Sequence, residues 1–115
     1  MAIKAPLIPF IRTIADAIDK YASEQGFGKN DYAVVGTWDE KTDRISLIFG
    51  TDRQIDERQW YSGILRAIRE ALADYSWMTR NIGLVVENVQ SLDEVYLESP
   101  VGEDEVELTE LLERR

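Results

Sequence analysis

Apolar residues recur every three or four positions along the first part of the chain. This spacing places six side chains on one face of a helix, namely Leu7, Phe10, Ile11, Ile14, Ile18 and Tyr21. Pro9 suits the first turn of such a helix, and Gly26 suits the left-handed residue that ends one. The pattern therefore predicts an amphipathic helix over residues of about 9–25.

Two runs with β-sheet character follow, at residues 32–38 and 44–49, and the polar stretch DEKTD separates them. They predict a β-hairpin with a turn of about four or five residues. One face of the hairpin is apolar and is formed by Val34, Trp38, Ile45, Leu47 and Phe49. The opposite face is also partly apolar, because it carries Ala33, Val35 and Ile48.

A second amphipathic helix is predicted after the hairpin. Thr51 and Gln54 match a capping box, and the helix is expected to run to about Tyr75. Its predicted buried arc consists of Tyr61, Ile64, Leu65, Ile68, Ala71, Leu72 and Tyr75. Trp60 lies on the margin of this arc, and the exposed flank carries Arg58, Arg66 and Arg69.

The next segment predicts a third strand at residues 82–89. Residues 91–99 are ambiguous, since Ser91 and Glu94 could cap a short helix whereas residues 95–97 could form a strand. We expect a short strand there. The element order is then α-β-β-α-β-(β)-(α), which predicts an α/β (α+β) fold. The expected architecture is a two-layer sandwich, with two amphipathic helices on one face of a three- to four-stranded mixed sheet.

The chain of 115 residues has the length of one domain. We expect a single α/β domain over residues 1–99 and an acidic C-terminal tail over residues 100–115. Net charge is −9, and residues 81–115 hold 10 acidic and 2 basic side chains. The tail could be a mobile solvated end, a terminal helix, or a segment that docks on Arg58, Arg66 and Arg69. We expect a mobile tail.

Candidate chemistry is sparse, because the chain contains neither histidine nor cysteine. Serine hydroxyls therefore lack the usual general base, and thiolate chemistry is excluded. Acidic residues cluster before the second helix and in the hairpin turn, at Asp52, Asp56, Glu57, Asp39, Glu40 and Asp43. Helix capping and turn formation explain such positions, so we expect neither a metal site nor a cofactor.

These observations favour a non-catalytic protein-binding or assembly domain, expected to be a homodimer with a protein partner. The interface candidates are Trp60, Trp77, Val35, Ile48 and Val85, because aromatic residues are enriched at interfaces and apolar patches meet other surfaces. The alternative is a small acid/base or divalent-metal-dependent enzyme that uses the carboxylates at the start of the second helix.

Nucleic acid is not expected as a partner, because the acidic chain repels phosphate backbones. A membrane partner is not expected either, since no apolar run has the length of a span. A cytoplasmic location is expected, because Arg12 and Asp16 interrupt the N-terminal apolar stretch early. No motif identifies a family. In size, acidity and element order the chain resembles the class I type III secretion chaperones, small acidic α/β homodimers that bind segments of partner proteins, although it is at least one strand short of them.

Overall fold

A computed structural model of the chain describes residues 8–39, 41–75, 79–98, 105–109 and 112. Its strands form one mixed sheet in the order β3-β2-β1-β4. These strands are β1 (Tyr32–Asp39), β2 (Arg44–Thr51), β3 (Ile82–Asn88) and β4 (Glu105–Glu107). Strand β2 pairs antiparallel with β1 and parallel with β3, and β4 pairs antiparallel with β1.

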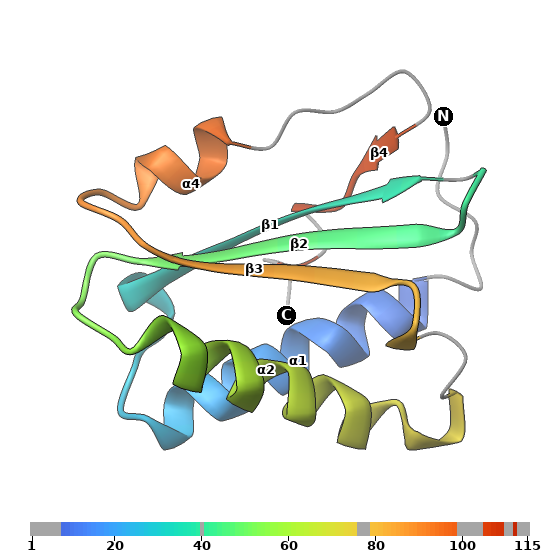
Figure 1. The fold of residues 1–115 in the computed structure, drawn as a ribbon, viewed down its shortest axis with the longest axis horizontal. Coiled ribbons are helices and arrows are strands. Elements are labelled where there is room, and N and C mark those ends of the chain that lie inside the picture. The colour runs from blue at the N-terminus through green and yellow to red at the C-terminus, as the bar shows by residue number, and fades with distance from the viewer. Residues whose placement is uncertain (1–7, 40, 76–78, 99–104, 110–111, 113–115) are drawn as a thin grey trace.

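Helices α1 (Ile8–Glu24) and α2 (Glu57–Ala71) lie on one face of the sheet, and the short helix α4 (Asp93–Leu97) lies on the other (Figure 1). Two 3₁₀ turns, η2 (Lys29–Asp31) and η3 (Ala73–Tyr75), complete the described helical elements. The predicted fold class is confirmed, with a mixed sheet and two amphipathic helices packed against one face.

The main core lies between the sheet and the α1–α2 pair. Ile11, Ile14 and Ile18 of α1 are buried there, as the helical spacing predicts. The hairpin face predicted from alternation is also confirmed, because all five of its side chains are buried in the same core: Val34, Trp38, Ile45, Leu47 and Phe49.

The predicted end of α1 is confirmed at Gly26. Its φ is +82°, a left-handed conformation that glycine adopts without a steric penalty. The amide of Phe27 then donates to the carbonyl of Ala22 at 2.9 Å. The chain thus leaves α1 through a glycine cap.

The capping box predicted at Thr51 is wrong. Thr51 is the last residue of β2, and its hydroxyl donates to the carbonyl of Asp31 at 2.6 Å. The N-cap of α2 is Asp56, whose carboxylate accepts from the amides of Arg58 and Gln59. The helix therefore begins later than the sequence pattern indicates.

The buried face of α2 is also rotated from the predicted arc. Trp60 is buried together with Ile64 and Ile68, whereas Tyr61 and Tyr75 are 42% and 48% exposed. The expectation that both tyrosines lie in the core is wrong. A face built on steps of four residues from Trp60 meets the sheet instead.

The short strand expected in residues 91–99 is wrong. Residues 93–97 form α4, and the amide of Glu94 donates to the carbonyl of Ser91 at 3.1 Å in its first turn. Val95 is its fully buried side chain. Packing of this one side chain against the sheet favours the helix over a strand. A segment of five residues with one buried side chain shows no hydrophobic periodicity from which the helix could be predicted.

The C-terminal segment joins the sheet. Strand β4 pairs with β1, and the amide of Leu108 donates to the carbonyl of Gly36 at 2.8 Å. Leu108 and Leu112 are both buried in the main core. Gly36 leaves the space for Leu112, since a Cβ added there would lie 2.8 Å from Leu112 Cδ1. Residues 105–109 and 112 therefore belong to the folded domain, and the mobile tail expected beyond residue 99 is wrong for these residues.

Candidate functional site

The sheet face opposite α1 and α2, here called the outer face, is partly covered by α4 (Figure 1). Beside α4 a groove of about 450 Å³ runs across β1, β2 and β3. Val35, Ile48 and Val85 contribute apolar side chains to its lining. Val85 is 49% exposed, so this face presents apolar surface to solvent at the middle of β3.

Helix α4 is held on the outer face by Val95. This side chain is fully buried and forms a small second core with Ala33 and Val35. A Cβ added at Gly50 would overlap Val95, so the glycine allows the helix to approach the sheet closely. The result is a wall along one side of the groove.

One end of the groove carries a cation. Arg44 of β2 lies across Gly83 of β3, and a Cβ added at Gly83 would lie 2.6 Å from Nη2 of Arg44. Both residues line the groove. The guanidinium therefore occupies the place that a side chain at position 83 would take.

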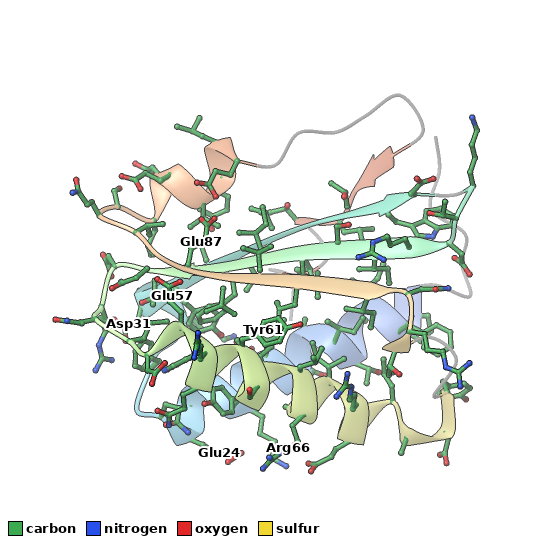
Figure 2. The ribbon with its side chains drawn as sticks, in the orientation of Figure 1. Glu24, Asp31, Glu57, Tyr61, Arg66 and Glu87 are labelled. Carbon is green, nitrogen blue, oxygen red and sulfur yellow. The ribbon has the colours of Figure 1, made fainter. Side chains whose placement is uncertain are left out.

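The other end carries a pair of carboxyl groups. Glu98 lines the groove just after α4, and Glu87 lies on β3 beside it. A hydrogen bond with Glu98, partial burial, and repulsion from Glu98, Glu57 and Glu94 raise the pKa of Glu87 to about 7. Figure 2 shows Glu87 on the α4 side of β3 and Glu57 on the α2 side. A protonated Glu87 can donate to the Glu98 carboxylate.

Three of the interface candidates from the sequence come together in this groove. Val35, Ile48 and Val85 are contributed by β1, β2 and β3, respectively. Val35 itself is 1% exposed, because α4 covers it, and Ile48 is partly buried. Val85 is thus the apolar contact that a partner would reach most directly.

The two tryptophan candidates do not belong to this site. Trp60 is 5% exposed and packs against the rings of Tyr21, Phe27 and Phe49. Its assignment to an interface is corrected, because the side chain lies inside the main core. Trp77 lies outside the described residues.

The alternative in which the C-terminal segment docks on Arg58, Arg66 and Arg69 is wrong for the described residues. The three arginines are exposed on α2, and Arg66 extends away from the sheet (Figure 2). Helix α2 contacts β3, whereas β4 lies beside β1 at the opposite edge of the sheet. Charge complementarity with these arginines is outweighed by burial of Leu108 and Leu112.

Three residues of the acidic clusters found in the sequence have structural partners, and Glu40 lies outside the described residues. Asp56 caps α2, and Asp39 accepts from the amides of Lys41 and Thr42 in the hairpin turn. Asp43 accepts from the indole nitrogen of Trp38 at 2.9 Å. Within the part of the chain that the structure describes, no group of three or more acidic residues has an arrangement that could hold a metal ion.

Sequence reasoning missed Arg44, Glu87 and Glu98. Alternation along β2 places Arg44 on the same face as Ile48, and a glycine inside a strand is typical of a close approach. These signals could have linked Arg44 to Gly83. The pairing of Glu87 with Glu98 depends on how α4 docks, which the sequence pattern does not indicate.

Comparison with family models, with curated proteins and with solved structures finds no match to this chain. Among the helices in the described residues, none combines the length and apolar character needed to cross a bilayer.

Proposed function

We propose that this chain is a non-catalytic protein-binding or assembly domain, and that its binding surface is the outer-face groove. The observation that carries the proposal is Val85, which is 49% exposed at the centre of an edge strand and pairs with Ile48, the neighbour of Val35 on the next strand. Apolar surface that lies between charged ends is typical of a site that meets another polypeptide.

The groove offers both apolar contact and orientation. Covering a half-exposed valine contributes about 1 kcal/mol, so Val85 alone would give weak binding. Arg44 and Glu98 add opposite charges at the two ends of the groove, which would fix the direction of a bound segment. The combination favours a polypeptide partner over a small apolar ligand.

The chain's charge supports the same class of partner. A net charge of −9 opposes binding to phosphate backbones and to anionic lipid surfaces. We therefore include in the proposal a protein partner, with a second copy of the chain among the candidates. A cytoplasmic location is a separate part of the proposal.

One observation favours the alternative of a small acid/base enzyme. Glu87 has a pKa raised to about 7 and lies at a groove, as catalytic carboxyls often do. Of the carboxylates expected at the start of the second helix, Glu57 is the one whose charge acts on Glu87. Glu98, the hydrogen-bonding partner, is exposed, and an open site of this kind provides little of the water exclusion that supports acid/base catalysis.

The proposal is tested by differential capture from extracts of the protein's own host. Immobilised wild type is compared with Val85→Glu, which places a charge at the centre of the groove, and with Leu97→Glu, which changes an 86% exposed residue of α4. Proteins retained by wild type and Leu97→Glu but lost with Val85→Glu support the groove as the binding surface. Identical capture by all three variants argues against it.

A further inference from the structure

Among the described residues, strand β3 leaves one edge of the sheet open. It is the terminal strand in the order β3-β2-β1-β4. Its sequence, IGLVVEN, contains no proline and no lysine, and Glu87 is its only charged residue. Edge strands are usually protected from pairing by such residues or by a bulge. An apolar edge with a single charge, and with neither proline nor lysine, is a template for another strand.

The backbone groups available at this edge follow from the pairing with β2. The carbonyl of Asn81 accepts from the amide of Ile45, and the amide of Val89 donates to the carbonyl of Thr51. The backbone amide and carbonyl groups of the odd-numbered residues in this segment therefore point toward β2. Successive residues of a strand direct their amide and carbonyl groups to opposite sides. The amides and carbonyls of Leu84 and Val86 therefore point outward.

We propose that the partner at this surface is a second copy of the chain, whose β3 pairs antiparallel with β3 of the first about a twofold axis at Val85. This inference rests on the proposed function and specifies its partner. It extends the four-stranded sheet of each copy into one continuous sheet.

The register is set by the strand itself. Val85 is the central residue of Ile82–Asn88, so an axis at Val85 pairs the strand along its full length. Leu84 of one copy then faces Val86 of the other, and these residues exchange hydrogen bonds through the groups that point outward. The two Val85 side chains meet as a non-hydrogen-bonded pair, about 4.5 Å apart at their Cα atoms. Their exposed apolar surface is thereby buried.

The same register places opposite charges together. Gly83 of one copy lies opposite Glu87 of the other, and residues that face each other across an antiparallel pair share one face of the sheet. Arg44 already occupies the side-chain position at Gly83. Among the described residues, no carboxylate forms an ion pair with Arg44. Each copy therefore provides Arg44 for Glu87 of the other, twice per dimer.

The helix side of the sheet offers a matching contact. Gly63 and Ala67 face α1, since both line a cavity with Ala17 and Tyr21. The spacing of helical residues places Tyr61 and Leu65 on the opposite flank of α2, the flank nearer the open edge. Tyr61 is 42% exposed there (Figure 2). Two copies of α2 would thus approach each other beneath the joined strands.

Disulfide trapping tests the axis. The chain has no cysteine, so Val85→Cys introduces a single thiol. In the proposed dimer the two Cα atoms lie about 4.5 Å apart, within the range that a disulfide spans. We expect rapid cross-linking under mild oxidation. Leu97→Cys, at an 86% exposed position on α4, gives the rate for random collisions.

Two results of trapping overturn the proposal. Cross-linking of Val85→Cys at the collision rate of Leu97→Cys would exclude an axis at Val85. Efficient self-cross-linking of Leu84→Cys in place of Val85→Cys would shift the register and separate Arg44 from Glu87.

A charge-exchange cycle tests the ion pair by sedimentation equilibrium. At about pH 8, above the raised pKa of Glu87, its carboxyl group is charged. Arg44→Glu and Glu87→Arg should then each weaken dimerisation by about tenfold, because each brings like charges together. The double variant should recover most of the loss, since it restores opposite charges. If the losses of dimerisation free energy in the two single variants add up in the double variant, Arg44 and Glu87 do not contact each other.

The outcomes separate this inference from the proposed function. Wild type that remains monomeric at about 100 µM, or a dimer without Val85→Cys cross-linking, overturns pairing through β3. Loss of captured host proteins with Val85→Glu would in either case still support the groove as a binding surface for another protein. Absence of that loss together with a trapped Val85→Cys dimer would restrict the surface to self-association.

Discussion

Two glycines shape the outer face by leaving room for side chains that belong to other residues. Gly50 accommodates Val95 of α4, and Gly83 accommodates the guanidinium of Arg44. The two neighbouring side chains differ in how easily they can move aside, because Val95 is fully buried whereas Arg44 is exposed and flexible. Glycine inside a strand suggests such contacts from sequence, but it does not identify the residue that fills the space.

Gly50→Ala should therefore destabilise the protein. The new methyl group overlaps Val95, and relief of such overpacking costs about 1–3 kcal/mol. Urea denaturation measures the loss. Gly83→Ala is the matched control, since the end of Arg44 can move aside, and it should cost under about 1 kcal/mol. Equal effects of the two variants would show that α4 does not seat at Gly50.

Glu87 should make stability depend on pH. Its pKa rises from 4.5 to about 7 on folding, through its hydrogen bond with Glu98, burial, and the nearby charges of Glu98, Glu57 and Glu94. The folded state thus binds more protons between these two values. The contribution of protonated Glu87 to the free energy of unfolding is fully present below pH 4.5 and is lost as pH rises through about 7. The site is open to water, so the loss should be under about 1 kcal/mol.

Glu87→Gln removes this titration, and its unfolding midpoint should fall less than that of wild type between about pH 5 and about pH 8. Glu70→Gln, an exposed change on α2, should follow wild type. Parallel curves for all three proteins would mean that Glu87 does not share a proton with Glu98.

At the scale of elements, the sequence predicted the segments with a long periodic signal. Helix α1 and the β1–β2 hairpin are confirmed, because several turns or strand residues repeat the same pattern. The helix α4 was the alternative that the sequence did not favour, and β4 was missed, since five and three residues carry too little periodicity. Tertiary docking determines both of them, through Val95 in one case and through Leu108 in the other.

Substitution of Asp56 at the start of α2 distinguishes a role in helix capping from a role in metal binding. Asp56→Ala should cost about 1 kcal/mol, because the amides of Arg58 and Gln59 lose their acceptor. Asp52→Ala, an exposed change nearby, should have a negligible effect in the same urea titration. Tight binding of Mg²⁺, Ca²⁺ or Mn²⁺ in calorimetry, abolished by Asp56→Ala, would instead support the enzyme alternative.

The C-terminal segment should contribute to stability. Leu108→Ala removes a fully buried side chain from the main core and should cost about 2–5 kcal/mol. Leu97→Ala, at an 86% exposed position, serves as the control. A loss of less than about 1 kcal/mol in the free energy of unfolding, with fast amide exchange at Leu108, would support a mobile tail instead.

At the scale of the whole molecule, charge and topology favour the β3 edge for association. Residues 81–115 hold 10 acidic and 2 basic side chains, so contact between two copies is generally repulsive. The sheet places β4, from this acidic region, at the edge opposite β3. The open edge is thus separated from part of the negative charge and carries Arg44 beside it. Sequence alone gave the charge asymmetry but not this separation, which depends on the antiparallel pairing of β4 with β1.

Amide hydrogen exchange of β3, measured over a range of protein concentrations, shows whether two copies of the chain pair through this edge. The amides of Leu84 and Val86 point out of the sheet, so they should exchange fast in dilute protein and slowly once β3 pairs with a second copy. The amide of Ile45, bonded to Asn81 at 2.8 Å, should remain protected throughout and serves as an internal reference. Protection of Leu84 and Val86 that rises with concentration is the predicted result. Fast exchange at both amides up to about 100 µM would contradict assembly through this edge.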